Sequence, residues 1–332
     1  MAILYNNDLD SKALAGRRVC VLGFGAQGRA QALNLRDSGV DVVVGLRENS
    51  SHRTAALDER LAVATPAEAV ATAHVIVMLV PDTAQASVYR DLEPVLAAGA
   101  CLVFAHGYAI RFEKITPRDD IDVVMVAPMG IGEQVREVYR RGAGVPALLA
   151  IQQDASGNAR QIGEAYAHAN GHGHAGVIET TFAEETETDL FAEQVVLCGG
   201  LNHLVIAAFE TLVDAGYQPE VAYFCCLHEV RYMAEMLQRR GIATTRESIS
   251  VVAEYGDYTR GPAIIGNASR EAMRAALEDI QSGRFTRELD AAIASGGSEL
   301  KAGRQAAREH LLESVGAQLR GNMRWLNKEQ DQ

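Results

Sequence analysis

The uninterrupted apolar runs of the sequence are short. Runs such as VIVMLV at 75–80 fall far short of the roughly 20 residues that a spanning helix needs. The chain also does not open with a basic region, an apolar stretch and a small-residue cleavage site, so we expect no secretory signal. These absences predict a cytoplasmic protein without a membrane partner.

Cysteine is scarce and forms no recognisable motif. The five cysteines, at 20, 101, 198, 225 and 226, are odd in number and show neither CxxC nor metal-finger spacing. Reduced thiols in a cytoplasm are therefore expected, and a disulfide framework is not.

Positive charge is also in short supply. The chain has 31 Lys and Arg against 43 Asp and Glu, a net charge of −12, and residues 161–230 contain no Lys or Arg at all. Such an acidic chain is not expected to bind nucleic acid or an anionic membrane surface.

The first half alternates between short β-branched runs and helix-like segments. The runs occupy 18–25, 40–47, 74–82, 101–107, 122–130 and 145–154, and the helical segments include 27–38 and 83–97. Continuous apolar strands separated by helices are typical of a parallel sheet covered on both faces. Residues 1–181 are therefore predicted to form an α/β Rossmann-like domain.

The strand pattern disappears after about residue 181. Helical periodicity follows over roughly 183–216, 218–240, 246–256, 267–282 and 300–325. We predict a second, all-α domain over 182–327.

A glycine-rich turn follows the first of these strands. In VLGFGAQGRAQALNL, Gly23 allows a tight turn, Gly25 lets the backbone approach a pyrophosphate, and Gly28 allows close packing of helix on strand. The helix N-terminus adds amide donors and a positive dipole. A structural turn could carry the same letters, but the strand–turn–helix context favours dinucleotide binding.

The end of the second strand bears on which dinucleotide binds. The stretch GLRENSSHR at 45–53 contains Arg47 and Ser50, which suit the 2′-phosphate of NADP, and Glu48, which suits the ribose hydroxyls of NAD. NADP is favoured and NAD stays open.

Three acids occupy one face of the first long helix of the second half. Glu185, Asp189 and Glu193 are spaced i, i+4, i+8. A solvated stripe is the commoner fate of such acids, but no Lys or Arg is near enough in sequence to pair with them. Carboxylates one turn apart suit Mg²⁺, so metal binding is an equal alternative.

Longer stretches resemble a known family. GFGAQGRAQALNLRDSGVDVVVGLR, AHGYAI, AGVIETTFAEETETDLFAEQVVLCGG, ETLVDAGYQPEVAYF, LHE and AEYGDYTRGP together resemble ketol-acid reductoisomerases of the short class I form, over nearly the whole chain. The resemblance implies a Rossmann-like domain followed by a knotted all-helical domain. It also implies a homodimer, or a multiple of dimers, with active sites completed across the interface.

The resemblance implies a reaction in two halves. Two Mg²⁺ ions polarise a 2-hydroxy-3-keto acid, an alkyl group migrates from C2 to C3, and NADPH reduces the resulting ketone. Matched position by position, the catalytic residues are His106, Glu229 and Ser250, and the metal ligands are Asp189, Glu193 and Glu229. The cofactor positions are Gly23, Phe24, Gly25, Ala26, Gln27, Gly28, Arg47, Ser50, His52, Asp82, Gln85, His106 and Gly132. The substrate positions are Met129, Cys225, Ser250 and Ala253.

This sequence departs from the family pattern at positions that the resemblance places in the active site. Met129 stands where the family has its active-site lysine, and Cys225 stands where it has one of two second-metal glutamates. The other departures are Ala109 for an asparagine, Ile131 for a proline, Glu133 for a histidine, and Val251 and Val252 for a polar pair. A thiol is a soft ligand that suits Mg²⁺ poorly, so the second metal site is expected to be weakened.

Three hypotheses follow. The leading one is a divergent member of specialised metabolism, in which Mg²⁺- and NAD(P)-dependent redox chemistry acts on a small 2-hydroxy, 2-keto or 2,3-dihydroxy acid. Oxidation of such a diol beside a leaving group could close a cyclopropanol ring. The second is an authentic reductoisomerase that converts 2-acetolactate to 2,3-dihydroxyisovalerate in valine and isoleucine biosynthesis. The third is a non-catalytic nucleotide-binding paralogue.

Overall fold

The structure is a computed structural model that describes residues 3–323. It comprises two compact units that meet between Thr188 and Asp189, within a single helix. The first is an α/β unit with one sheet and the second is helical, which confirms the expected fold class. The predicted knot of the helical domain and the exact domain boundaries stay predictions, and the predicted end at residue 327 lies outside the described residues.

A nine-stranded sheet organises the described part of the first unit. Its strands are β1 (Ile3–Leu4), β2 (Arg18–Leu22), β3 (Asp41–Gly45), β4 (Ala62–Ala64), β5 (Val75–Met78), β6 (Cys101–Phe104), β7 (Asp122–Pro128), β8 (Ala147–Gln153) and β9 (Val177–Glu179). Their order across the sheet is β1-β9-β8-β7-β6-β5-β2-β3-β4. The chain therefore reverses direction across the sheet beside β2, which is where doubly wound folds bind ligands.

The expectation of a purely parallel sheet is wrong. In the order across the sheet, the six strands β7, β6, β5, β2, β3 and β4 run parallel. However, β8 pairs antiparallel with β7, and β1 pairs antiparallel with β9. An apolar run predicts burial and not direction, so the sequence pattern could not distinguish the two cases. The short strands β1, β4 and β9 were not anticipated, because two or three residues carry no periodicity.

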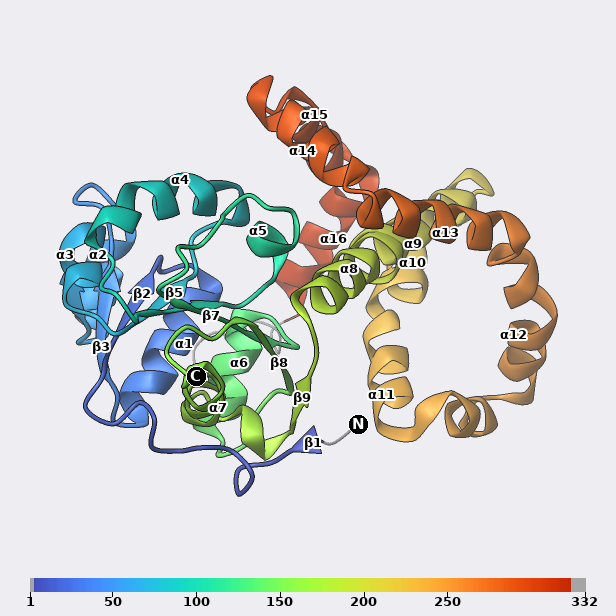
Figure 1. Ribbon diagram of the computed structural model, residues 1–332. Helices are drawn as coiled ribbons and strands as arrows, with labels where there is room; N and C mark the ends of the chain where they lie inside the picture. The colour runs from blue at the N-terminus through green and yellow to red at the C-terminus, as the bar shows by residue number, and fades with distance from the viewer. Residues whose placement is uncertain (1–2, 324–332) are drawn as a thin grey trace. The chain divides into compact units, whose positions relative to one another are not determined.

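Helices cover both faces of the sheet, as expected (Figure 1). Along β2, Val19 and Val21 point into one apolar cluster and Cys20 and Leu22 into the other, the alternation of a strand buried on both sides. One face carries α1 (Ala26–Asp37) and α7 (Ala159–Ala169), with α6 (Gly132–Arg140) packed on α1. The other carries α3 (Pro66–Ala71), α4 (Asp82–Leu92) and α5 (Tyr108–Arg111). The remaining helical segments are α2 (His52–Asp58), η1 (Glu93–Val95) and η2 (His172–His174).

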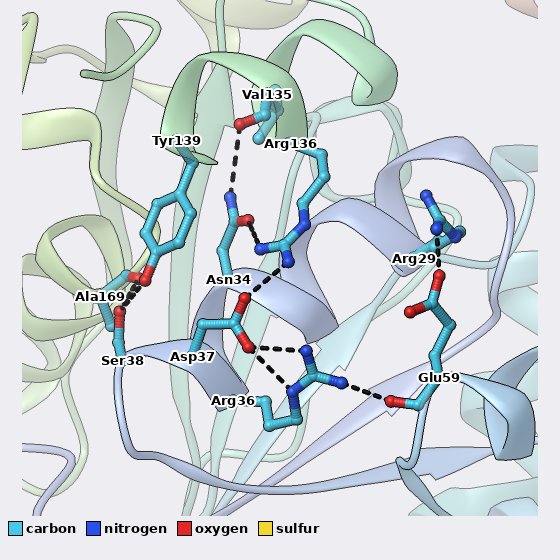
Figure 2. Close-up of polar contacts among 10 residues, drawn as sticks. All are labelled: Arg29, Asn34, Arg36, Asp37, Ser38, Glu59, Val135, Arg136, Tyr139 and Ala169. Atoms are coloured by element: carbon cyan, nitrogen blue, oxygen red, sulfur yellow. Dashed lines mark hydrogen bonds and ion pairs between the residues drawn. The ribbon is translucent and has the colours of Figure 1, made fainter. Parts of the chain in front are cut away.

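Polar contacts join α1 to α6 (Figure 2). Arg136 donates to Asn34 Oδ1 at 2.8 Å and to the Asp37 carboxylate at 2.6 Å, and the Asn34 amide donates to the carbonyl of Val135 at 3.4 Å. Asn34 is fully buried, so these partners meet the hydrogen-bonding needs of its amide.

The second unit is built from helices around a small core of its own. They are α8 (Phe182–Ala192), which begins in the first unit, the π-turn η3 (Glu193–Leu197), α9 (Gly199–Asp214), α10 (Pro219–Tyr223), the π-turn η4 (Phe224–His228), α11 (Val230–Ser248), α12 (Val251–Ile264), α13 (Asn267–Gln281), α14 (Arg284–Ala294), α15 (Ser298–Glu309) and α16 (Leu311–Asn322). Phe209 and Tyr223 are buried against Val315 in that core.

The helix boundaries differ from the sequence expectation in three places. Each of the first two long helices is interrupted by a π-turn, a helix that was expected over 246–256 instead begins after Ser250, and the segment 300–325 is two helices. α14 was not anticipated. Apolar periodicity did not predict either wide turn, because a single π-turn displaces the helical pattern by only about one residue.

Candidate active site

Predicted cofactor and substrate residues follow four neighbouring parallel strands. Gly23 follows β2, Asp82 follows β5, His106 follows β6 and Met129 follows β7. Since carboxyl ends of parallel strands share one edge of a sheet, these residues gather along a single edge, next to the point where the strand order reverses.

The glycine-rich turn has the geometry that its sequence predicts. Gly23 has a φ of 97°, and a Cβ there would lie 2.6 Å from the carbonyl oxygen of Leu79. A Cβ on Gly28 would lie 2.4 Å from the carbonyl oxygen of Gly23. A Cβ on Gly25 would meet no atom within 4 Å. Open space therefore lies at the N-terminus of α1, where a pyrophosphate fits.

Residues around that turn contribute in different ways. The side chain of Phe24 is 5% exposed and belongs to the core, so only its backbone is placed to face a nucleotide. A Cβ on Gly132 would lie 2.3 Å from the carbonyl oxygen of Ala26, so α6 starts directly against the turn. The Gln27 side chain donates to the carbonyl of Gly130 at 2.9 Å.

The end of β3 leaves Arg47 exposed. No ion pair or hydrogen bond of the Arg47 side chain occurs within residues 3–323, whereas Arg53 is occupied with the carbonyl of Leu46 at 2.9 Å. Ser50 is half-buried, and its hydroxyl accepts from the backbone N–H of the exposed His52 at 3.3 Å. Arg47 is thus the cation best placed for a 2′-phosphate, while Glu48 beside it is equally exposed.

Gln85 and Asp82 lie together at the start of α4. Gln85 is buried, and its amide nitrogen donates to Asp82 at 2.9 Å and to the carbonyl of Val80 at 3.3 Å. Its amide oxygen is buried and has no partner among the described residues, so it is an acceptor suited to a ligand donor such as a carboxamide. Desolvation by the surrounding protein raises the pKa of Asp82, although solvent still reaches its side chain. The nearby His106 lowers this pKa, and Glu185 raises it further.

His106 is held by a buried carboxylate. Its Nδ1 lies 2.9 Å from Glu185 Oε1, and Glu185 Oε2 accepts the backbone N–H of Gly107 at 2.8 Å. Glu185 is 3% exposed, so this contact is shielded from water. A Cβ on Gly107 would lie 2.3 Å from Thr186 Oγ1, so the glycine of the AHG motif lets the first turns of α8 lie directly against the end of β6.

Asp189 extends this pair to a group of three. It follows Glu185 by one turn of α8, so the continuous helix fixes the two acids relative to each other. Ligand atoms of His106, Glu185 and Asp189 all lie within 4.8 Å of one another. The two carboxylates supply oxygen ligands that fit a hard divalent ion such as Mg²⁺, and the imidazole lies beside them.

Glu185 is the site residue that was not among the positions matched to the family. The i, i+4, i+8 stripe did single it out beside Asp189 and Glu193, but nothing in the sequence connected it to His106. That pairing depends on α8 lying against β6, which is tertiary information.

The other predicted residues of the helical unit lie outside this group. Within residues 3–323 no second group of three candidate ligands occurs. Glu193 opens the first π-turn, Cys225 lies in the second and Glu229 directly follows it, and all three are exposed. π-turns are frequent at functional sites because they turn side chains out of the regular helical register.

Ser250 has a structural role in the described chain. Its hydroxyl accepts from the backbone N–H of Ala253 at 3.2 Å and thereby caps α12. Val251 and Val252, next to it, are 79% and 84% exposed, and Met129 and Ile131 are also exposed. The expectation that these four line a more apolar pocket stays a prediction.

Two family models match the two halves of the chain. One, described as acetohydroxy acid isomeroreductase, NADPH-binding domain, matches residues 13–176. The other, ketol-acid reductoisomerase, C-terminal domain, matches residues 182–325. The chain belongs to the ketol-acid reductoisomerase family. The resemblance noted in the sequence is thereby confirmed.

Solved structures agree with this family. An NADH-preferring ketol-acid reductoisomerase from an uncultured archean is 41% identical, with a TM-score of 0.94 over 97% of this chain and 99% of that one. A semialdehyde dehydrogenase NAD-binding protein from Cupriavidus necator, solved with calcium and NAD, is 17% identical with a TM-score of 0.60, over 80% of this chain and 99% of its own. A pyrroline-5-carboxylate reductase from Coxiella burnetii is 14% identical with a TM-score of 0.56, over 80% and 98%. The last two share the fold alone.

One helical segment of this ketol-acid reductoisomerase family member is apolar enough to note. Among the described residues, Phe182–Asp214 has the length and composition of a membrane span, and only 11% of its most apolar window is buried. Its first turns carry Glu185 and Asp189, and the whole segment falls within the family's C-terminal domain. One such helix is weak evidence for a membrane span, because core helices of soluble proteins pass the same test.

Proposed function

We propose that the protein is a cytoplasmic NAD(P)- and Mg²⁺-dependent oxidoreductase that acts on a small 2-hydroxy, 2-keto or 2,3-dihydroxy acid. The observation that carries the proposal is the group of His106, Glu185 and Asp189 at the end of β6. It adjoins the sheet edge that bears the glycine-rich turn. Nucleotide site, proton carrier and metal-ligating carboxylates are thus supported on one scaffold.

The nucleotide site fits a nicotinamide dinucleotide. The open space at Gly25 suits the pyrophosphate, exposed Arg47 suits a 2′-phosphate, and the buried amide oxygen of Gln85 suits a donor. When bound, the nicotinamide supplies or accepts the hydride. NADP is the first expectation, and the similarity to an NADH-preferring relative keeps NAD open.

Glu185 sets the state of His106. With Nδ1 donating to Glu185, Nε2 carries the basic lone pair of the ring and is the atom that takes or returns a proton. The tautomer follows from the carboxylate, which accepts only. Buried Glu185 also favours the imidazolium that forms when Nε2 is protonated.

The carboxylates fit Mg²⁺ better than Cys225 does. Asp189 lies beside Glu185 in the structure, and Glu193 and Glu229 are expected to join it by resemblance. Bound Mg²⁺ supplies charge that polarises a substrate oxygen. With Cys225 in place of a carboxylate, one tight ion is expected and a second is expected to bind weakly.

An authentic reductoisomerase is the second candidate function. It is favoured by 41% identity to a ketol-acid reductoisomerase over nearly the full chain. It is opposed by Met129 and Cys225, since alkyl migration needs both metal ions and the family lysine most. Hydride transfer depends less on the two metal ions and the lysine, so a remodelled enzyme would retain hydride transfer and lose the alkyl migration.

Turnover of 2-acetolactate distinguishes the two. Purified protein is assayed with Mg²⁺ and either NADPH or NADH, with dinucleotide binding measured in parallel. Formation of 2,3-dihydroxyisovalerate at an ordinary enzymatic rate establishes the reductoisomerase. Tight dinucleotide binding without turnover supports the remodelled enzyme. Absence of dinucleotide binding under all conditions contradicts both and leaves the non-catalytic hypothesis.

The remodelled enzyme is then tested on 2,3-dihydroxy acids with a leaving group two carbons from the acidic C–H. Oxidation of one hydroxyl passes a hydride to NAD(P)⁺ and the hydroxyl proton to a base. Loss of the acidic C–H proton from the neighbouring carbon, which keeps its own hydroxyl, then forms the enolate. The enolate carbon then displaces the leaving group and closes a cyclopropanol ring. Mass spectrometry detects the loss of the leaving group, and absorbance detects the reduced dinucleotide in equal amount. Reduced dinucleotide without ring product would restrict the proposal to simple oxidation.

A further inference from the structure

Three side chains form a hydrogen-bonded series beneath the glycine-rich turn. The Tyr166 hydroxyl donates to Gln31 Oε1 at 2.6 Å, Gln31 Nε2 donates to Gln27 Oε1 at 2.9 Å, and Gln27 Nε2 donates to the carbonyl of Gly130 at 2.9 Å. Tyr166 comes from α7 and both glutamines from α1. The series therefore runs from one helix, through a second, to the loop that joins β7 to α6.

The polarity of the series is fixed by its last member. The Gly130 carbonyl only accepts, so Gln27 must present its amide nitrogen there and its oxygen to Gln31. Gln31 must then present its own oxygen to Tyr166. Tyr166 and Gln31 have no exposed surface, and burial raises the pKa of the Tyr166 hydroxyl, so it stays a donor. Reversing either amide would leave two polar groups facing like partners, without water to replace them.

The loop at the end of the series carries two predicted site residues. Met129, which replaces the family lysine, is exposed there, and Gly132 lies against the backbone of Ala26. On its other side the loop is held by the Met129 N–H, which donates to the carbonyl of Pro146 at 2.8 Å. Gln27 is thus a side-chain contact between the nucleotide turn and this loop, and Gln31, by donating to Gln27 Oε1, holds the Gln27 amide in the orientation that the Gly130 carbonyl requires.

We propose that Gln31 is a positioning residue that couples nucleotide binding to the placement of the loop at 129–132. The inference rests on the proposed function, because it takes the nucleotide to bind at the glycine-rich turn and the substrate to lie by Met129. Gln31 touches neither ligand. It acts through Gln27, whose backbone belongs to the turn and whose side chain holds the loop.

Substitution of Gln31 by Met tests the proposal. Methionine keeps the length and volume of the side chain and removes both hydrogen bonds, so the Gln27 amide can rotate away from Gly130. We expect NADPH, or NADH where that is the tighter ligand, to bind about tenfold more weakly, the effect of one hydrogen bond. Hydrogen exchange of the peptide that spans 129–132 should become faster in the same variant.

Asn34→Leu is the matched control. Asn34 lies on the same helix, is equally buried and uses its amide to hold Val135 and Arg136 of α6 (Figure 2). It should lower the melting temperature as Gln31→Met does, but leave dinucleotide binding within about twofold. Equal weakening by the two variants would mean general loosening of α1 and would overturn the proposal.

A double-mutant cycle separates action through Gln27 from an independent effect. If Gln31 acts through Gln27, the variant Gln27→Met with Gln31→Met binds dinucleotide no more weakly than Gln27→Met alone. Additive losses contradict the proposal. Tyr166→Phe, which removes only the first hydrogen bond, is the mildest variant and should weaken binding about threefold. Unchanged binding and exchange in Tyr166→Phe would also count against it.

Failure of the proposed function gives a different result. If the wild-type protein binds neither NADPH nor NADH, the nucleotide site itself is refuted. If the wild type binds and Gln31→Met binds equally well, only the positioning role falls.

Discussion

Glu185 makes the residue-scale contact on which the candidate site depends. It is buried, accepts the Gly107 N–H and accepts from His106 Nδ1. A glutamine in its place could still accept from Gly107, but its NH₂ would then face Nδ1. The imidazole would have to carry its proton on Nε2, which removes the basic atom from the substrate side.

Glu185→Gln is therefore expected to lower turnover by roughly 100-fold or more, the usual contribution of a general acid–base group. Steady-state kinetics on the identified substrate provide the measurement. Glu184→Gln is the control, because Glu184 is the adjacent residue, is exposed, and its carboxylate accepts a hydrogen bond from the Thr180 hydroxyl at 2.7 Å. A comparable loss in both variants would show that charge on α8, and not the contact with His106, determines activity.

Cys225 offers a gain-of-function test. Cys225→Glu restores hard oxygen at the position where the family has a carboxylate, four residues before Glu229. Calorimetric titration of this variant with Mg²⁺ should then either detect a second bound ion or show that the weaker ion binds at least about tenfold more tightly than in the wild type. Cys225→Ser, which keeps the size without the charge, should not. Identical titrations for the Glu variant and the wild type would remove Cys225 from the metal site.

The burial of His172 should make the folded state sensitive to acid. It is fully buried, its Nδ1 bonds the carbonyl of Val145 at 2.9 Å, and its Nε2 has no partner among the described residues. Burial lowers the pKa of His172 from 6.5 to about 4, against a small opposing effect of the Val145 hydrogen bond. Because the unfolded state takes up the proton first, the stabilisation is complete above pH 6.5 and is lost as pH falls toward 4.

The loss should reach about 3 kcal/mol at the low end of that range. Urea unfolding between pH 7 and pH 4 measures it. His172→Asn keeps a donor at the position of Nδ1 for Val145 and does not titrate, so its stability should fall less steeply over the same range. Parallel curves for the two proteins would assign the acid sensitivity to other groups.

At the scale of elements, the two π-turns are the feature that helical periodicity did not predict. The first is permitted by glycine: a Cβ on Gly200 would lie 1.9 Å from the carbonyl oxygen of Val195, five residues earlier. A wide turn moves that carbonyl next to the Cα of Gly200. The sequence LCGG contains the cause, but only the backbone geometry shows its effect.

Gly200→Ala should therefore destabilise the protein, by on the order of 2 kcal/mol, and weaken Mg²⁺ binding, since Glu193 opens the same turn. Gly303→Ala is the control, because Gly303 lies inside α15 with open space around its Cα. There alanine should stabilise by up to about 1 kcal/mol through helix propensity. Thermal unfolding compares them, and equal stability of the two variants would contradict the role of the π-turn.

What the sequence could predict of these elements follows from what each pattern encodes. The continuous apolar runs of β2 and its neighbours encode burial on two faces, so these strands and the covering of the sheet by helices on both faces were predicted correctly. The reversed direction of β8 depends on how the chain returns to the sheet after α6, which no residue pattern specifies. The same limit applies to the site: His106 and Glu185 were visible separately, and their contact was not.

At the scale of the whole molecule, the second unit exposes many large apolar side chains. Among the described residues after 188 these include Val196, Leu197, Leu204, Val221, Val251, Val252, Tyr255 and Ile264. A soluble monomer seldom exposes so much apolar surface over one domain. We expect a homodimer, or a multiple of dimers, that covers it.

Sedimentation equilibrium of the full chain should give at least twice the mass of 35.7 kDa at micromolar concentration. Leu204→Glu, on the exposed side of α9, should shift the distribution toward monomer, whereas Leu57→Glu, equally exposed but in the first unit, should not. A monomeric wild type would leave the apolar surface without a partner and would contradict the expectation.

Gly107 has a consequence for how this chain can diverge. By resemblance, Met129, Ala109 and Cys225 stand where the family has other active-site side chains. No replacement for Gly107 avoids adding at least one carbon, and that carbon would overlap Thr186 and approach the carbonyl of Phe182. The reaction can thus change by mutation at the surrounding positions. The spacing between the histidine and the carboxylates is fixed by steric exclusion and cannot vary gradually.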